Sequence, residues 1–172
     1  MSDQPIKRVT RFADIGDVPL HLVLVEPEIP PNTGNVARLC AATGCALHLI
    51  EPLGFSIDDR ALKRAGLDYW HKLMIVVHPS LDAFLAETAD RRRWFLSTRA
   101  TRTYAQATFR RGDFLVFGRE TKGLPQALLD AQSEHTLRIP MRHDSVRSIN
   151  LSSAVAVVTY AALDSLGFPE LS

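Results

Sequence analysis

The chain has 172 residues, of which 46% are hydrophobic and 23% charged, with a formal net charge of +1. This is enough for one domain with a substantial core. No apolar segment is long enough to span a bilayer, and the first residues lack the apolar core of a signal peptide, so we expect a cytoplasmic protein. The small net charge argues against a surface coated with positive charge for non-specific nucleic-acid binding.

The predicted elements alternate along the chain. Apolar runs predict strands at 21–25, 46–50, 73–77, 94–97, 114–117 and 136–139. Helical periodicity predicts helices near 33–43, 58–65, 80–88, 125–131 and 150–166. The alternation is typical of an α/β fold with a mostly parallel sheet flanked by helices. Residues 1–18 show no sustained period, so we predict an N-terminal extension followed by one domain over 19–172.

The loop after the first strand is rich in proline. Three prolines within residues 26–31 fix their own φ and restrict the residues before them. We therefore expect extended geometry at Glu26, Ile29 and Pro30, and a rigid loop.

The helix that follows this loop contains two residues of interest. Asn32 or Thr33 is expected to cap the helix, and Gly44 to end it. Considered alone, Asn32 is a cap and Arg38 a solvated helix residue.

A glycine-containing loop follows the strand at 114–117. Its sequence is Gly118-Arg119-Glu120-Thr121-Lys122-Gly123-Leu124-Pro125. A glycine at a strand exit lets a ligand approach the backbone closely. The loop is no P-loop, because Leu124 and Pro125 stand where Lys and Ser or Thr would be needed. No Gly-x-Gly-x-x-Gly follows the first strand, which disfavours a dinucleotide enzyme. A purely structural turn remains the alternative.

The last helix is apolar almost all round. It follows a long polar loop, in which Asn150 can cap it, and it runs from Leu151 to Leu163. Such a helix must be buried on more than one side, so we predict a homodimer that uses this C-terminal helix. A β-strand formed by the valine-rich run is the competing interpretation, which the length, the asparagine cap and the alanines disfavour.

Cysteine, histidine and arginine usage adds three expectations. Cys40 and Cys45 suit reduced, packed thiols better than a disulfide framework. No histidine has a convincing metal spacing, so we predict no metal. Arginine outnumbers lysine 16 to 4. Guanidinium groups suit phosphate, so the local arginine groups indicate an RNA-facing patch, although genomic base composition explains the same excess. These groups are Arg91, Arg92 and Arg93; Arg99 and Arg102; Arg110 and Arg111; and Arg142 and Arg147.

Three segments together resemble the motifs of the SPOUT family of RNA methyltransferases. They are Asn32-x5-Arg38, the loop 117–125, and Ile139-Pro140-Met141 followed by residues 148–152. Residues 27–35, Asp58-Asp59 and the stretch 64–70 narrow the resemblance to the TrmL-type tRNA 2′-O-methyltransferases, which modify the wobble nucleotide, position 34. The resemblance covers roughly residues 20–168. It implies a deep C-terminal trefoil knot, which pattern reading alone does not predict.

The resemblance also implies the site. S-adenosylmethionine would be bound by Leu96, Gly118, Ile139 and Ser148. The catalytic positions would be Arg38, Asn32, Glu120 and Asn150, with Arg38 activating the ribose hydroxyl. A guanidinium is a poor base at neutral pH, so we expect Arg38 to hold the adjacent phosphate and stabilise the developing alkoxide.

By the same resemblance the partner is the anticodon stem-loop of a tRNA, by analogy leucine tRNA. The alternatives are another tRNA position, ribosomal RNA, a non-catalytic RNA-binding paralogue, or an α/β domain for another nucleotide. The chain departs from the family pattern at Arg142-His143 and Val146, which puts the shape of the cofactor loop in question. Arg119 adds a charge that either contacts RNA or folds back onto Glu120.

Overall fold

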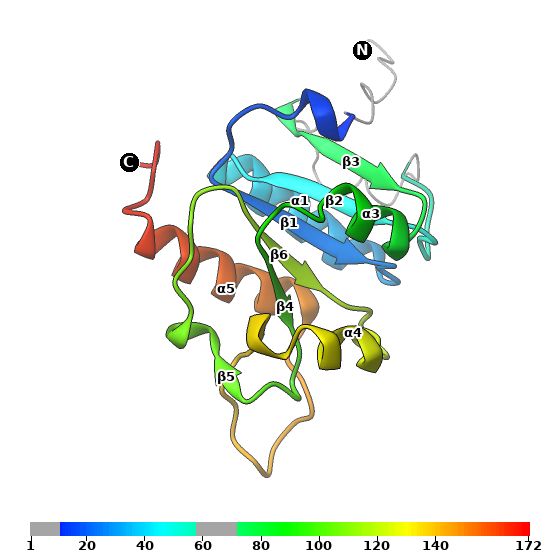
Figure 1. The fold of residues 1–172 in the computed structure, drawn as a ribbon, viewed down its shortest axis with the longest axis vertical. Coiled ribbons are helices and arrows are strands. Elements are labelled where there is room, and N and C mark those ends of the chain that lie inside the picture. The colour runs from blue at the N-terminus through cyan, green and yellow to red at the C-terminus, as the bar shows by residue number, and fades with distance from the viewer. Residues whose placement is uncertain (1–10, 58–71) are drawn as a thin grey trace.

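The computed structural model of the chain describes residues 11–57 and 72–172. In these residues seven parallel strands form one sheet in the order β3-β2-β1-β6-β4-β7-β5 (Figure 1). The strands are β1 (Leu20–Val25), β2 (Ala46–Ile50), β3 (Ile75–His78), β4 (Arg93–Leu96), β5 (Arg102–Thr103), β6 (Asp113–Phe117) and β7 (Thr136–Arg138). The helices are α1 (Pro30–Thr43), α3 (Leu81–Glu87), α4 (Gln126–Ala131) and α5 (Leu151–Ser165), with 3-10 turns η1 (Phe12–Asp14), η3 (Tyr104–Gln106) and η4 (Ser133–His135).

Two helical layers cover the sheet (Figure 1). Along β1, Leu20, Leu22 and Leu24 belong to the core cluster that contains α1 and α5 residues. Val23 and Val25 belong to the opposite cluster, with Phe84 of α3 and Leu129 of α4. Because successive strand side chains point to opposite faces, one apolar run serves both layers. These findings confirm the predicted α/β class.

The strand order places the loops of interest side by side. β1 pairs with β2 on one side and with β6 on the other, and β6 pairs with β4. After β1 the chain adds β2 and β3 on one side of it, and the later strands β4 to β7 are added on the other side. In parallel sheets, ligands bind beyond the carboxyl ends of the strands at such a change of direction. The loops after β1, β4, β6 and β7 all leave at this edge.

Most predicted elements are present, with instructive differences. The two-residue strand β5 and the 3-10 turns were not predicted, because segments this short show no period. The predicted helix at 58–65 and the motif residues 58–59 and 64–70 lie outside the described residues. The knot stays a prediction, as does the domain boundary at 18/19. Part of the predicted extension packs on the sheet, since the Phe12 ring contacts those of His21, His48 and Phe114.

Three buried histidines form a ladder across β1, β2 and β3. His21 Nδ1 lies 2.9 Å from His48 Nε2, and His48 Nδ1 lies 2.9 Å from His78 Nε2. His78 Nδ1 lies 3.1 Å from the Glu87 carboxylate at the half-exposed end of α3. Burial lowers the pKa of His21 to about 4, lowers that of His48 well below its usual value, and lowers that of His78. The three rings are therefore neutral in the folded protein at pH 7.

Some of the grouped arginines form contacts within the fold, and others line a cavity. Arg92 pairs with the buried Asp113 carboxylate at 3.0 Å. Arg111 bridges Asp17 and Glu170 at 2.8 and 3.0 Å, joining the two ends of the described chain. Arg102 donates to backbone carbonyls and lies over the Trp94 ring, whereas Arg99 and Arg147 line the cavity described below. Arg92, Arg102 and Arg111 therefore have partners within the fold, and an RNA-facing patch of the arginine groups stays a prediction.

The two cysteines are buried free thiols, as expected. Burial raises the pKa of both. Within the described part of the chain, no helix is long and apolar enough to cross a membrane.

Candidate active site

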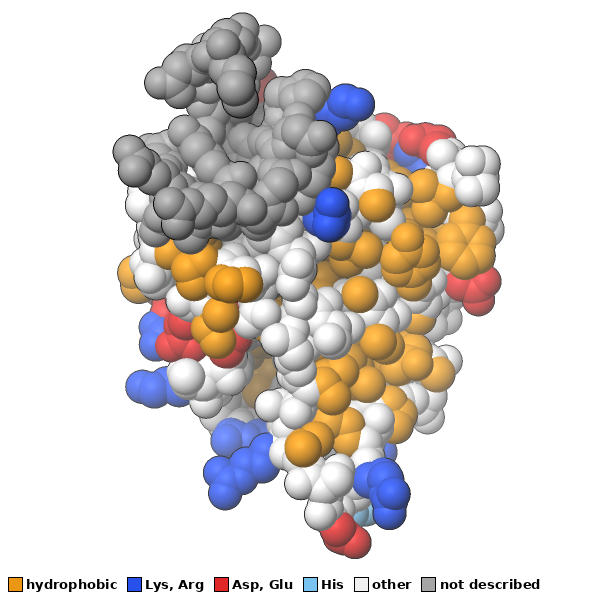
Figure 2. Space-filling view, turned by 180° about the vertical axis from the view of Figure 1, so that it is seen from behind, with side chains coloured by type: hydrophobic (Ala, Val, Ile, Leu, Met, Phe, Trp, Pro, Cys, Tyr) orange, Lys and Arg blue, Asp and Glu red, His pale blue; other side chains and the backbone are white. Residues whose placement is uncertain are grey.

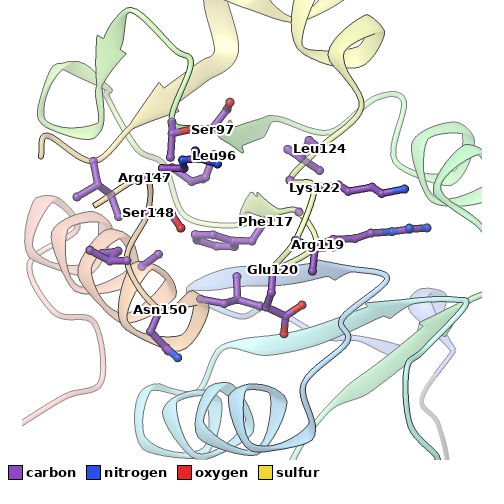
Figure 3. Close-up of a pocket in the computed structure, with 18 of the residues that line it drawn as sticks. Leu96, Ser97, Phe117, Arg119, Glu120, Lys122, Leu124, Arg147, Ser148 and Asn150 are labelled. Carbon is purple, nitrogen blue, oxygen red and sulfur yellow. The ribbon is translucent and has the colours of Figure 1, made fainter. Parts of the chain in front are cut away.

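A cavity of about 560 Å³ opens at the carboxyl ends of β4, β6 and β7 (Figure 3). Its walls come from the loop after β1, the glycine-containing loop after β6, and the segment before α5. The structure brings seven of the eight predicted site residues to its lining, namely Asn32, Leu96, Gly118, Glu120, Ile139, Ser148 and Asn150. These residues lie up to 118 positions apart in the sequence, and only the sheet order unites them.

Arg38 is the exception among the predicted residues. It lies on α1, six residues after Asn32, and it does not line the cavity. Its side chain is exposed. The cavity and Arg38 are therefore separate parts of one region, joined through α1.

The glycine-containing loop folds tightly on itself. The backbone N–H of Gly123 donates to the Arg119 carbonyl at 2.9 Å, and Gly123 has φ +65°. A Cβ on Gly118 would lie 2.2 Å from the Gly123 carbonyl carbon and 2.3 Å from the Leu124 nitrogen. A side chain at Gly118 is thus excluded by the loop's own backbone. The turn itself therefore requires this glycine, and the close ligand approach expected from the sequence stays a prediction at a residue that lines the cavity.

The loop after β1 differs from its predicted geometry at two of three residues. Ile29 is extended as expected, with φ −108° and ψ 108°. Glu26 instead has φ 48°, in the left-handed region, and Pro30 is the first helical residue. A proline is tolerated at that position because its missing N–H would have no helical partner.

The expected cap of α1 is wrong as well. Ile29 occupies the cap position and makes no side-chain hydrogen bond to the helix, while Asn32 and Thr33 lie buried inside the first turn. Gly44 ends the helix in the left-handed conformation, as predicted.

Glu120 supplies the acceptors that the start of α1 lacks. Its Oε2 accepts the backbone N–H of Glu28 at 3.0 Å, and its Oε1 accepts the backbone N–H of Ile29 at 3.2 Å. Oε1 also accepts the Asn32 amide at 3.3 Å. A carboxylate is favourable at this end of a helix, where unpaired N–H groups carry positive partial charge.

Asn150 extends this network to the third wall. Its Nδ2 donates to Asn32 Oδ1 at 3.0 Å, and its Oδ1 accepts from the backbone N–H of Ser152 at 2.9 Å, capping α5 as predicted. Figure 3 shows Glu120 and Asn150 both pointing toward α1. A continuous chain of hydrogen bonds, Glu120 to Asn32 to Asn150, therefore links the three segments.

A second set of contacts joins the same two loops. The Glu28 carboxylate accepts the backbone N–H of Thr121 at 3.1 Å and its hydroxyl at 3.0 Å. Arg119 is ion-paired with Glu26. Arg119 therefore folds back onto Glu26 and not onto Glu120, and its contact with RNA stays a prediction.

The other residues that line the cavity are of three kinds: apolar, cationic and hydroxyl-bearing. Strand-end and helix residues provide the apolar part: Leu96, Phe117, Leu124, Leu129, Leu137, Ile139 and Leu151. Arg99, Lys122 and Arg147 provide cations, and Ser97, Thr98 and Ser148 provide hydroxyls. Such a lining suits a ligand with a flat apolar ring at one end and a carboxylate at the other. Among the described residues, no group of three or more His, Cys, Asp or Glu side chains is arranged to hold a metal ion.

Comparison with known proteins agrees with this geometry. The SpoU rRNA Methylase family model matches residues 19–160. The chain belongs to the SpoU methylase family. It is 52% identical over 149 residues to the tRNA (cytidine(34)-2′-O)-methyltransferase of Saccharophagus degradans, covering 86% of this chain and 96% of that protein.

Solved structures of this family extend the comparison. One described as giving insight into 2′-OH methylation of C/U34 on tRNA is 48% identical, with TM-score 0.82, covering 88% of this chain and 99% of that one. The SpoU methyltransferase AviRb of Streptomyces viridochromogenes, solved with AdoMet, is 20% identical with TM-score 0.76, covering 96% and 63%. The latter likeness shows the fold alone.

Sequence reasoning missed Glu28 and Thr121 in this region. Glu28 stands inside the proline-rich motif, and Thr121 inside the glycine-containing loop. Their positions inside two of the family motifs were the one feature of the sequence that pointed to them. Nothing in the sequence paired a residue of one motif with a residue of the other.

Proposed function

We propose that this chain transfers a methyl group from S-adenosylmethionine to the ribose 2′-oxygen of nucleotide 34 in a tRNA. The observation that carries the proposal is the hydrogen-bonded chain Glu120–Asn32–Asn150, which closes one side of the cavity. Membership of the SpoU methylase family supports the reaction class, and the similarity to the Saccharophagus degradans enzyme supports the tRNA position.

The cavity fits the methyl donor. We assign its apolar part, with Leu96 and Ile139, to the adenine ring, and its cationic rim to the carboxylate of the methionine moiety. Gly118 and Ser148 complete the predicted cofactor wall. When bound, S-adenosylmethionine supplies an electrophilic methyl group on a sulfonium.

The protein's own contribution is positioning and charge. Glu120 already accepts three hydrogen bonds from the chain, out of about four acceptor sites on a carboxylate, so it holds α1 in place and does not serve as a free base. Asn32 is fixed from both sides, by Glu120 and by Asn150. Rigid placement of reacting groups supplies much of the rate acceleration in a displacement of this kind.

Arg38 has a separate role. Its exposed position on α1 suits contact between its guanidinium and the phosphate beside the target ribose. From there it stabilises the alkoxide that develops on the 2′-oxygen as the hydroxyl proton passes through that phosphate to solvent. The new carbon–oxygen bond forms as the methyl–sulfur bond breaks, and S-adenosylhomocysteine is the leaving group. Replacing Arg38 with Ala should abolish methylation and leave cofactor affinity nearly unchanged. Wild-type turnover in this variant would exclude the role.

The substrate is the anticodon stem-loop of a tRNA, and by analogy leucine tRNA. The test is incubation of the protein with unmodified total tRNA and labelled S-adenosylmethionine, followed by mass-spectrometric mapping of the methylated nucleotide. Label at position 34 supports the proposal. Label at another tRNA position, or in unmodified ribosomal RNA incubated in parallel, refutes the assigned target, and cofactor binding without transfer identifies a non-catalytic RNA-binding paralogue.

We propose that the working form is a homodimer formed through α5. The inner side of α5 is buried, whereas Val157 and Tyr160 are 39% and 45% exposed, and Ile149 just before the helix is 36% exposed. Figure 2 shows apolar side chains gathered on the face that α1 and α5 cover. Light scattering after size exclusion should give twice the chain mass, and Tyr160→Glu should halve it. A monomeric wild type at micromolar concentration would overturn the proposal.

A further inference from the structure

The loops after β1 and β6 are joined by three consecutive residues of the glycine-containing loop. Arg119 pairs with Glu26, Glu120 accepts the backbone N–H groups of Glu28 and Ile29, and Thr121 donates twice to the Glu28 carboxylate. The Glu28–Thr121 contact, together with the Glu28 N–H bond to Glu120, is called here the Glu28 clasp. In it the backbone N–H of Glu28 donates to Glu120, and the Glu28 side chain accepts from the next residue of that loop, Thr121.

The Glu28 side of the clasp lies outside the cavity, and its partners Glu120 and Thr121 line it. Glu28 therefore cannot act on a bound ligand directly. Its backbone, however, is directly followed by Ile29 and the first turn of α1, which carries Asn32.

The two segments that the clasp joins differ in how far their own backbone fixes them. On one side, the tight turn of Gly118 and Gly123 fixes the glycine-containing loop, since the backbones there leave no space for a Cβ on Gly118. On the other side, α1 begins without a side-chain cap of its own. The clasp therefore holds the start of α1 at a fixed place relative to the glycine-containing loop, which forms the cofactor wall.

The Glu28 carboxylate needs hydrogen-bond donors, and Thr121 supplies two of them. The carboxylates of Glu28 and Glu120 each accept hydrogen bonds across the junction of these two loops, and like charges repel each other. Glu120 is satisfied by N–H groups at a helix start, and Glu28 by the Thr121 N–H and hydroxyl. Hydrogen bonds to an ionised acceptor are among the stronger ones in proteins.

We infer that Glu28 and Thr121 are positioning residues that couple the cofactor wall to the substrate side of the site. This inference rests on the proposed function, because it assigns the cofactor to the glycine-containing loop and the ribose to α1. Loss of the clasp lets the start of α1 shift relative to the bound methyl donor. It should therefore reduce kcat while leaving the cavity able to bind the donor.

The test compares Glu28→Ala, Thr121→Val, the double variant and Thr121→Ser, using tRNA methylation rates and calorimetry with S-adenosylmethionine. Misplacement of reacting groups by about 1 Å can cost about 100-fold, so we expect kcat of Glu28→Ala to fall by about 10- to 100-fold. Thr121→Val keeps the backbone donor and should lose less. In Glu28→Ala the cofactor Kd should change by less than about threefold, because Glu28 does not line the cavity.

Two features separate positioning from general destabilisation. The double variant should be no worse than Glu28→Ala, because both changes break one contact. Thr121→Ser keeps the hydroxyl and should restore turnover. Glu134→Gln, an exposed carboxylate whose residue does not line the cavity, is the matched control and should behave as wild type. Turnover of Glu28→Ala within about twofold of wild type, or single losses that multiply in the double variant, would overturn the inference. If Glu28→Ala does not fold, Thr121→Val is judged by the same criteria.

A second measurement needs no RNA and so tests the clasp even if the proposed substrate is wrong. Hydrogen exchange on peptides covering residues 26–32 reports the Glu28 and Ile29 N–H groups that Glu120 holds. S-adenosylmethionine should slow their exchange in the wild type, and this effect should be reduced in Thr121→Val. Equal protection in both proteins would refute the coupling, whatever the identity of the RNA substrate.

Discussion

The histidine ladder predicts that the protein loses stability in mild acid. In the unfolded chain each histidine has a pKa of about 6.5 and is protonated at pH 5. In the fold, burial holds the pKa of His21 at about 4 and lowers those of His48 and His78. Arg91 disfavours a charge on His21, whereas Glu87 partly favours one on His78. The unfolded state therefore binds more protons, and stability falls with pH below about 6.5.

The magnitude follows from the pKa of His21. Between the unfolded pKa of 6.5 and pH 5 lie 1.5 pH units, and each unit is worth about 1.4 kcal/mol, so His21 alone costs roughly 2 kcal/mol at pH 5. For a chain of this size, that corresponds to a decrease in Tm of roughly 4–8 °C. His48 and His78 act in the same direction, and the loss from His21 continues until the pH reaches about 4.

Thermal melting followed by circular dichroism at pH 7 and pH 5, at constant ionic strength, measures the effect. His21→Leu should be less stable at pH 7, because His48 loses a partner, but its stability should differ less between the two pH values. His143→Gln, at an exposed position, should leave the wild-type difference unchanged. A wild-type Tm that is the same at pH 5 and pH 7, or full acid sensitivity in His21→Leu, would refute the reasoning.

Three further substitutions test the site and the core. Gly118→Ala should weaken S-adenosylmethionine binding by tenfold or more, on the order of 1.4 kcal/mol, because the new Cβ displaces Leu124; unchanged calorimetric affinity would contradict this. Asp113→Ala should destabilise the fold by about 1.5–3 kcal/mol, because the partly exposed Arg92 guanidinium and the buried Trp94 N–H lose their acceptor, measurable as a lower urea midpoint. Asn150→Ala should cost about 1 kcal/mol through the lost α5 cap and should slow methylation strongly; a stability loss with normal turnover would separate the cap from the site.

Local pattern was sufficient for much of the fold. Apolar runs of four or five residues identified every strand but β5, and the helix boundaries at Gly44 and Asn150 followed from the conformations those residues favour. The three motifs also identified the cavity, because seven of the eight predicted residues line it. The start of α1 was missed, since Glu120, 88 residues away from Asn32, satisfies the groups that a local cap was expected to satisfy.

The sequence by itself determined which segments become strands, which become helices, and which loops carry polar groups, because these depend on neighbours within a few residues. The tertiary structure alone decided the partners of those groups. The histidine ladder exists because β1, β2 and β3 are adjacent with His21, His48 and His78 on one face, and the Glu28 clasp exists because β1 and β6 are adjacent. Strand order is a global result of packing both helical layers, and no local period encodes it.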